Sequence, residues 1–148
     1  KEEVWDSRGN LDSLLAEAVK ALAERTGNIA LAATDEGKVW HSGYASIFTN
    51  PEFSDIDVCA GLFSFLEEAE RINELFFGHV NRESPFEVFF GEELGWPEIG
   101  PVGVVTTHFE AGGKRGALGV IGSIGLSYST VIPTLRYFKS MIEEVAGV

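Results

Sequence analysis

The sequence predicts an α+β fold, in which one antiparallel sheet carries amphipathic helices packed on one of its faces. Three observations lead to this prediction. Apolar residues repeat at helical spacing near both ends of the chain, and the short apolar runs between them are typical of strands. Glycine-containing turns at 35–37 and 111–114 join these runs into two hairpins. With 148 residues and 45% hydrophobic content, residues 1–148 suffice for one domain with its own core.

The first half of the chain predicts two helices that enclose a hairpin. Asn10 can cap the first helix, whose apolar stripe continues until Thr26-Gly27-Asn28 ends it. Asp55 begins a long second helix, and Gly78 ends it. The predicted elements are a helix at 11–26, strands at 29–33 and 38–44, a loop at 47–57 and one helix at 55–78.

The second half of the chain predicts three strands and a terminal helix. The first strand, 86–90, lies between loops at 81–85 and 92–101, and the second of these loops is acidic. In the strand at 102–110, even-numbered residues such as Val104 and His108 face one side, and odd-numbered residues such as Val105 and Phe109 face the other. Apolar residues at helical spacing from Ile132 onward predict a helix that lies back on the sheet.

Glycines recur at every third position of the last strand, at 116, 119, 122 and 125. The apolar residues between them predict a strand buried on both faces: Leu118, Val120, Ile121 and Ile124. The spacing differs from the Gly-x-Gly pair of a dinucleotide site, from the Gly-Lys-Ser/Thr of a P-loop and from the Gly-x-Ser-x-Gly of a hydrolase. Close packing of strand and helix around small residues is therefore the favoured interpretation. An anion at the N-terminus of the terminal helix stays as an alternative.

The composition limits the classes of function. The formal net charge of -12 repels phosphate backbones, so we do not expect the chain alone to bind DNA or RNA. The single cysteine, Cys59, lies on a predicted buried helix face, and we expect an inert thiol in a reducing compartment. No secretory segment or membrane-length apolar run is apparent, which predicts a cytoplasmic protein. The start at Lys1, without a methionine, suggests a piece of a longer protein.

The residues that usually carry chemistry do not form a recognisable site. His41, His79 and His108 lack metal-ligand spacing with one another or with Cys59. The adjacent Glu92 and Glu93 point different ways in extended chain, and no serine has a recognisable base partner. We therefore predict no catalytic residue, no metal site and no cofactor, and hence not an enzyme.

Aromatic residues are more frequent in and beside the loops than strand propensity requires. Ordinary sheet and loop packing is one interpretation, and an apolar pocket or partner surface between the sheet and the loop at 46–54 is the other. The candidate ligand or partner surface comprises Trp40, Tyr44, Phe48, Phe53, Gly122, Ser123 and Tyr128.

Two stretches of the chain resemble the C-terminal half of the heat-inducible transcription repressors of the HrcA family. Residues 40–53, which end in Pro51-Glu52-Phe53, are similar to the family's Gly-x-x-Asn-Leu-Leu-x-x-Pro-Glu-Phe segment, and Leu66-Glu67-Glu68 to the helix after it. Phe90-Gly91-Glu92-Glu93 and residues 116–133 are similar to its Ile-Gly-x-Glu and Gly-x-Ile-Gly-x-Ile-Gly-Pro-x-Arg-Met-x-Tyr segments. The two stretches follow the family's order and cover most of the chain from Val39 onward.

The resemblance implies a GAF-like regulatory domain without catalysis of its own. It implies a chaperonin of the GroE type as partner, and contact with operator DNA only through a winged-helix segment that this chain lacks. A free-standing GAF-like sensor that binds a small molecule is the alternative function.

The chain departs from the family's pattern at three places. Ser123-Ile124-Gly125 stands in place of Pro-x-Arg, which removes a cation, and Ser46 stands where the family usually has asparagine. Asp35-Glu36-Gly37 occupies the position at which the family carries an inserted dimerising domain. Because that insertion supplies much of the family's dimer contact, we expect this domain to be a monomer or a weak homodimer.

Overall fold

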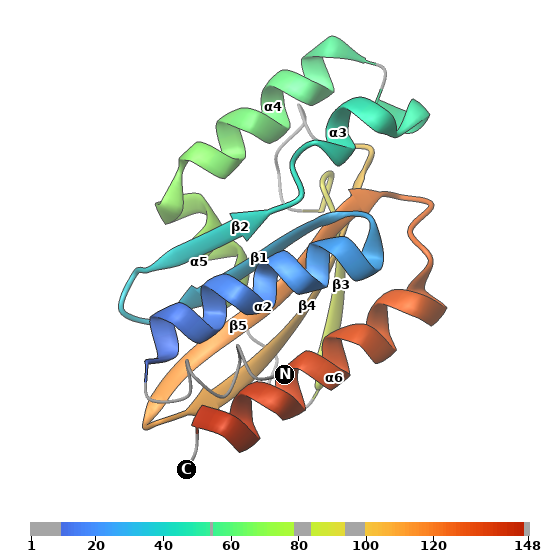
Figure 1. The fold of residues 1–148 in the computed structure, drawn as a ribbon. Coiled ribbons are helices and arrows are strands. Elements are labelled where there is room, and N and C mark those ends of the chain that lie inside the picture. The colour runs from blue at the N-terminus through green and yellow to red at the C-terminus, as the bar shows by residue number, and fades with distance from the viewer. Residues whose placement is uncertain (1–9, 54, 79–83, 94–99, 147–148) are drawn as a thin grey trace.

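A five-stranded antiparallel sheet with strand order β2-β1-β5-β4-β3 forms the centre of the fold (Figure 1). The computed structural model of the protein describes residues 10–53, 55–78, 84–93 and 100–146. The strands are β1 (Ile29–Thr34), β2 (Val39–Ser42), β3 (Phe86–Phe90), β4 (Val102–Ala111) and β5 (Lys114–Ser123). β5 lies at the centre of the sheet, between β1 and β4, and is antiparallel to both. The α+β fold with one antiparallel sheet is confirmed.

Helices cover both faces of this sheet. The described helices are α2 (Leu11–Thr26), α3 (Ser46–Thr49), the short 3₁₀ helix η1 (Pro51–Phe53), α4 (Ile56–Glu67), α5 (Ala69–Phe77) and α6 (Tyr128–Ala146). In Figure 1, α2 and α6 lie side by side on one face, whereas α5 lies behind the sheet. The prediction that the helices share one face is therefore wrong, because the central strands are apolar on both sides and each side needs its own cover.

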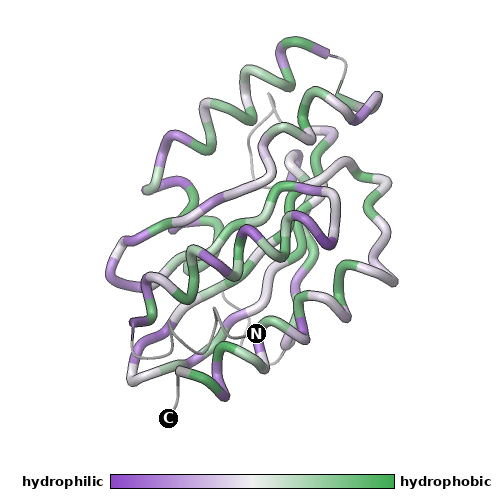
Figure 2. Tube along the Cα trace, viewed as in Figure 1, coloured by the Kyte–Doolittle hydropathy of each residue, from purple (hydrophilic) through white to green (hydrophobic). Residues whose placement is uncertain are grey.

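The two faces of the sheet bury separate cores. Alternate residues of β1 point to opposite faces: Ala30 and Ala32 pack with α2 and α6, whereas Ile29 and Leu31 pack with the helices from α3 to α5. β4 divides in the same way, with Val105 and Phe109 in the first core and Val104 in the second. Hydrophobic and hydrophilic residues alternate along α2 and α4 in Figure 2, as expected of helices with one buried face.

The first helix and hairpin follow the local signals in the sequence. The Ser13 backbone N–H donates to the Asn10 side-chain oxygen at 3.3 Å, which caps α2, and Gly27 ends the helix with φ +66°. The turn at 35–37 joins β1 to β2, as predicted. β2 is shorter than the predicted strand because Gly43, with φ +83°, turns the chain out of the sheet.

The region between β2 and β3 differs from its prediction. The predicted loop at 47–57 contains α3 and η1, and the predicted single helix is divided into α4 and α5 at Glu68, whose backbone is extended. The break redirects the chain, so that α5 can bury Ile72 and Phe76 in the same core as Leu62 of α4. Cys59 is half-buried rather than in the core, and its Sγ–H donates to the Phe53 carbonyl at 2.9 Å. Predictions for 79–83 and 94–99 lie outside the described residues.

The glycines of β5 make room for aromatic and aliphatic side chains on alternate faces. A Cβ atom at Gly116 would lie 2.2 Å from the Phe109 ring, and one at Gly119 would lie 2.8 Å from the Phe76 ring on the opposite face. A Cβ atom at Gly122 would meet Leu126 at 2.5 Å. Close packing of strand and helix is confirmed at Gly119, because Phe76 belongs to α5. At Gly116 the ring belongs to the neighbouring strand β4, and at Gly122 Leu126 belongs to the turn before α6. Ile124, by contrast, lies in the turn after β5 and is 56% exposed.

Candidate functional site

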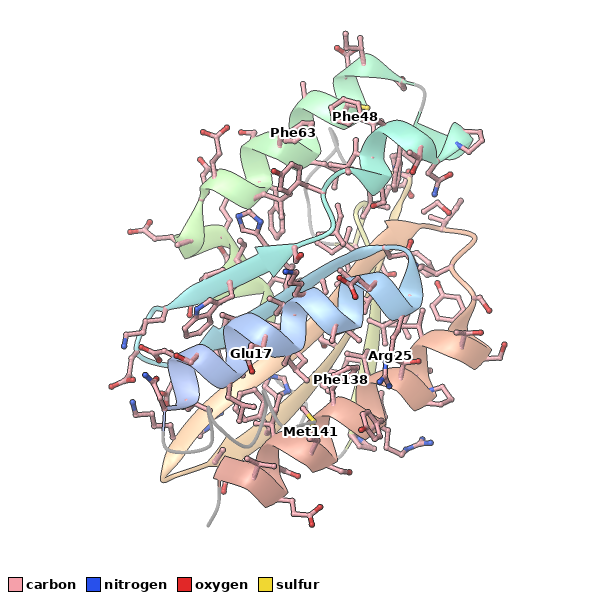
Figure 3. The ribbon with its side chains drawn as sticks, in the orientation of Figure 1. Glu17, Arg25, Phe48, Phe63, Phe138 and Met141 are labelled. Carbon is pink, nitrogen blue, oxygen red and sulfur yellow. The ribbon has the colours of Figure 1, made fainter. Side chains whose placement is uncertain are left out.

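A group of aromatic rings gathers on the surface where α3 meets α4. The Phe48 and Phe63 ring centroids are 5.5 Å apart, and Tyr44 meets Phe63 edge-on at 6.3 Å. His41, at the end of β2, meets Tyr44 edge-on at 6.4 Å. Phe48 is 72% exposed and Tyr44 is 52% exposed, whereas Phe63 is half-buried. Figure 3 shows Phe48 and Phe63 next to each other at this junction. We call these four residues the aromatic surface.

Buried residues and a close backbone contact fix the segment that carries Tyr44 and Phe48. Gly43 passes so close to the α2–β1 connection that a Cβ atom there would lie 2.5 Å from the Asn28 carbonyl oxygen, and Tyr44 follows directly. In α3, Ile47 is 1% exposed and anchors the helix in the core, which turns its neighbour Phe48 outward. Phe53 of η1 is a second buried anchor, and Cys59 of α4 bonds its carbonyl. Phe48 is thus presented by an anchored segment.

The segment that carries the aromatic surface is acidic. Residues 39–78 contain seven Asp or Glu residues and one Arg or Lys residue, which is Arg71. Carboxylates stand at both ends of α4, with Asp55 and Asp57 at its start and Glu67 at its end, and all three are exposed. Arg71 donates to Glu68 at 3.0 Å, so part of its charge is already neutralised.

The structure divides the predicted candidate residues into separate places. Tyr44 and Phe48 belong to the aromatic surface. Phe53 fills the space between the loop and the sheet, where it is 3% exposed. Trp40 lies opposite Ala32 in the β1–β2 register and packs in the core under α2, on the other face of the sheet.

Gly122, Ser123 and Tyr128 lie together at the junction of β5 and α6. Ser123 is 5% exposed, and its hydroxyl accepts a hydrogen bond from the Gly125 N–H at 3.2 Å. Leu126 and the Asn28 side-chain oxygen occupy the space beside Gly122. The Tyr128 hydroxyl is buried without a hydrogen-bond partner among the described residues, 3.5 Å from where a Cβ atom on Gly103 would lie. This junction is a packing contact between the sheet and the last helix.

Two residues of the aromatic surface, Phe63 and His41, were not among the predicted site residues. Phe63 falls on the apolar stripe of its helix, which predicted burial, and His41 falls on a strand. The helical period cannot show that Phe63 stays partly exposed beside α3. The sequence therefore carries no signal that Phe63 belongs to the aromatic surface.

Among the described residues, the side chains that could bind a metal or act in catalysis do not form a site. No three His, Cys, Asp or Glu side chains within them come together to hold a metal ion. His108, on β4, contacts the Phe76 carbonyl oxygen through its Nε2 atom, and the Lys139 ammonium donates to the His108 backbone carbonyl. Both contacts join helices to the sheet. No helix in the described part of the chain has the length and apolarity to cross a membrane.

Comparison with protein families gives a match over most of the chain. Residues 1–132 match the family described as the HrcA protein C terminal domain. A heat-inducible transcription repressor HrcA of Syntrophobacter fumaroxidans is 24% identical over 145 residues, which are 97% of this chain and 40% of that protein. The same repressor of Symbiobacterium thermophilum is 29% identical over 112 residues, 75% of this chain and 33% of the relative. The chain thus spans about two fifths or less of the length of these relatives.

Solved structures with the same fold agree with the GAF-like prediction. A hypothetical protein solved at 2.2 Å resolution superposes with a TM-score of 0.75 at 9% identity and covers 93% of this chain and 70% of its own. An IclR transcriptional regulator from Alicyclobacillus acidocaldarius superposes with a TM-score of 0.53 at 12% identity, over 97% of this chain and 72% of its own. At such identities these likenesses concern the fold alone. Because the family match extends over residues 1–132, the chain belongs to the HrcA family and corresponds to its C-terminal domain.

Proposed function

We propose that this chain is the non-catalytic regulatory domain of a heat-inducible transcription repressor, and that it acts by binding a protein. Family membership supports the repressor assignment, because its relatives are transcription regulators. The aromatic surface supports the binding role, because an anchored group of exposed rings is typical of protein contact sites. We further propose that the chain forms one domain, that the protein is cytoplasmic, and that the domain needs neither a cofactor nor a metal.

The proposed partner is a chaperonin of the GroE type, as the family resemblance implies. Immobilised chain should retain purified GroE-type chaperonin, and Phe48→Ser should weaken retention without lowering the melting temperature, because the Phe48 ring is mostly exposed. Tyr137→Ser on α6 is the matched control, because Tyr137 is 53% exposed and lies away from the aromatic surface. Equal retention of wild type and Phe48→Ser would count against this surface, and no retention at all would count against the partner.

A mobility-shift experiment tests the expectation that the chain alone does not bind DNA specifically. The net charge of -12 opposes the phosphate backbone, so contact with operator DNA is proposed only through a segment outside this chain. We expect no saturable complex at moderate salt with any operator fragment. Saturable binding at sub-micromolar protein would contradict the assignment of DNA contact to another segment.

Self-association of the domain is expected to be weak. By the family resemblance, the hairpin tip at 35–37 stands in place of a dimerising insertion, and its carboxylates would repel a second copy approaching head on. The structure reduces this repulsion, because Lys114 pairs with Glu36 at 3.1 Å. We expect a monomer or a weak dimer at micromolar concentration by sedimentation equilibrium. A tight dimer that persists at high salt would show that another surface joins two copies.

A further inference from the structure

We propose that the aromatic surface binds a cationic amphipathic segment of a partner polypeptide. Apolar side chains of this segment would lie against Phe48, Phe63 and Tyr44, and its lysine or arginine side chains would face the exposed carboxylates at the two ends of α4. This inference rests on the proposed function and deepens it, since it specifies the chemistry of the segment that the aromatic surface binds. The peptide experiments below do not use the chaperonin, so the two proposals can fail separately.

The first support is the position of the exposed rings. Phe48 leaves most of its area in water although Ile47 and Phe53, on either side of it, supply the buried anchors of the same segment. Ile56, at the start of α4, is 79% exposed and lies two helical turns before Phe63, which extends the apolar strip along the helix. A strip of this kind, with rings at its centre, is suited to the apolar face of a short helix.

The second support is the sign of the surrounding charge. Asp57 at one end of α4 and Glu67 at the other carry exposed carboxylates, and the one basic residue in 39–78 is already paired with Glu68. A segment with apolar residues alone would leave these carboxylates without compensation, whereas lysine or arginine beside the apolar residues would pair with them. Charge complementarity therefore selects a cationic segment.

The same charges argue against the other occupants. An anionic membrane surface or a nucleic acid would be repelled by the carboxylates at both ends of α4. A second copy of this chain that bound here would bring its own Asp55, Asp57 and Glu67 toward the same three carboxylates of the first copy. Like charges would then lie opposite one another.

NMR titration of the full chain tests the proposal. The probe is an amphipathic helical peptide of leucine and lysine, about 14 residues or four turns long, and its counterpart carries glutamate in place of every lysine. We expect micromolar binding of the lysine peptide, with amide shift changes confined to residues 41–49 and 56–67. We expect much weaker binding of the glutamate peptide. Absence of binding by the lysine peptide, or shift changes centred on α2 and α6, would overturn the proposal.

Matched variants separate this surface from general attraction between an acidic protein and a basic peptide. Phe48→Ser should weaken binding of the lysine peptide about tenfold, whereas Tyr137→Ser should leave it unchanged. Glu67→Lys should weaken it more than Glu144→Lys, a change at an exposed position near the end of α6. Equal effects within either pair would show that the peptide responds to net charge alone and would overturn the proposal.

Two further measurements decide between the partner polypeptide and the other occupants. Sedimentation equilibrium should show the same mass for wild type and Phe48→Ser, and vesicles of phosphatidylcholine, with or without phosphatidylglycerol, should not retain the chain. Self-association that Phe48→Ser abolishes would assign the surface to a second copy. Vesicle binding that the same change abolishes would assign it to a membrane.

Discussion

Replacing Phe76 by Ala is expected to lower the free energy of unfolding by about 3–5 kcal/mol. Phe76 is 1% exposed on α5, and its ring occupies the space that the missing side chain of Gly119 leaves on the central strand. Removing the ring leaves a cavity between α5 and β5 that the rigid strand cannot close. Urea denaturation of the full chain measures the effect. Phe48→Ala is the matched control, and we expect it to cost less than about 0.5 kcal/mol because that ring is mostly exposed.

Because the Phe76 ring packs directly on Gly119, we expect the effects of substitutions at these two positions on stability to be coupled. A Cβ atom on Gly119 would lie 2.8 Å from Phe76 Cε1, so Gly119→Ala is expected to be destabilising in the wild-type background. In a Phe76→Leu background the smaller side chain should relieve this contact, giving a coupling energy on the order of 1 kcal/mol in the double-mutant cycle. Strict additivity of the two changes would show that this contact does not govern the packing of α5 on the sheet.

The elements that the sequence predicts best are those with local causes. Asn10 as a cap, Gly27 at the end of the first helix and the turn at 35–37 each act on their immediate neighbours, and the structure confirms all three. The face that a helix covers has no such local cause. Alternation along β4 correctly separates Val104 from Val105, but it does not say which helix packs on either side. For that reason the two-sided arrangement was not predicted.

The break between α4 and α5 shows the same limit. Glu67 and Glu68 are ordinary helix residues, and neither glycine nor proline marks the position where the helix ends. The break arises because α4 and α5 must bury their apolar stripes against different parts of one core, which is a tertiary requirement.

Two of the predicted candidate residues, Tyr44 and Phe48, lie together on the aromatic surface, and side-chain direction explains why others do not. Exposure of Phe48 follows from the formation of α3, in which its neighbour Ile47 points into the core. Its place near the loop predicts that Trp40 belongs with the loop aromatics, but strand alternation in β2 places it under α2. The aromatic content of this region is compatible both with ordinary packing and with a surface, and the direction of each side chain decides which residues are exposed.

Replacing Gly122 by Val is expected to lower the free energy of unfolding by about 1–3 kcal/mol. The first side-chain carbon would lie 2.5 Å from Leu126 Cδ2 and 2.7 Å from the Asn28 side-chain oxygen, so the turn from β5 into α6 would have to move. Thermal and urea denaturation measure the loss. Leu126→Ala removes one of the two contacts, so Gly122→Ala should cost less in that background than in the wild type.

The same variants distinguish packing from an anion site at the junction of β5 and α6. If Gly122 is present for packing, Gly122→Val lowers the melting temperature by the same amount with and without inorganic phosphate, because phosphate has no site to lose. If it serves an anion at the N-terminus of α6, phosphate raises the melting temperature of the wild type and not of the variant. An unchanged melting temperature in buffer, together with lost phosphate or nucleotide binding, would contradict the packing role. A Cβ atom at Gly122 would already lie within 2.7 Å of Leu126 and the Asn28 side-chain oxygen, which leaves no room beside this glycine for an oxyanion and favours the first result.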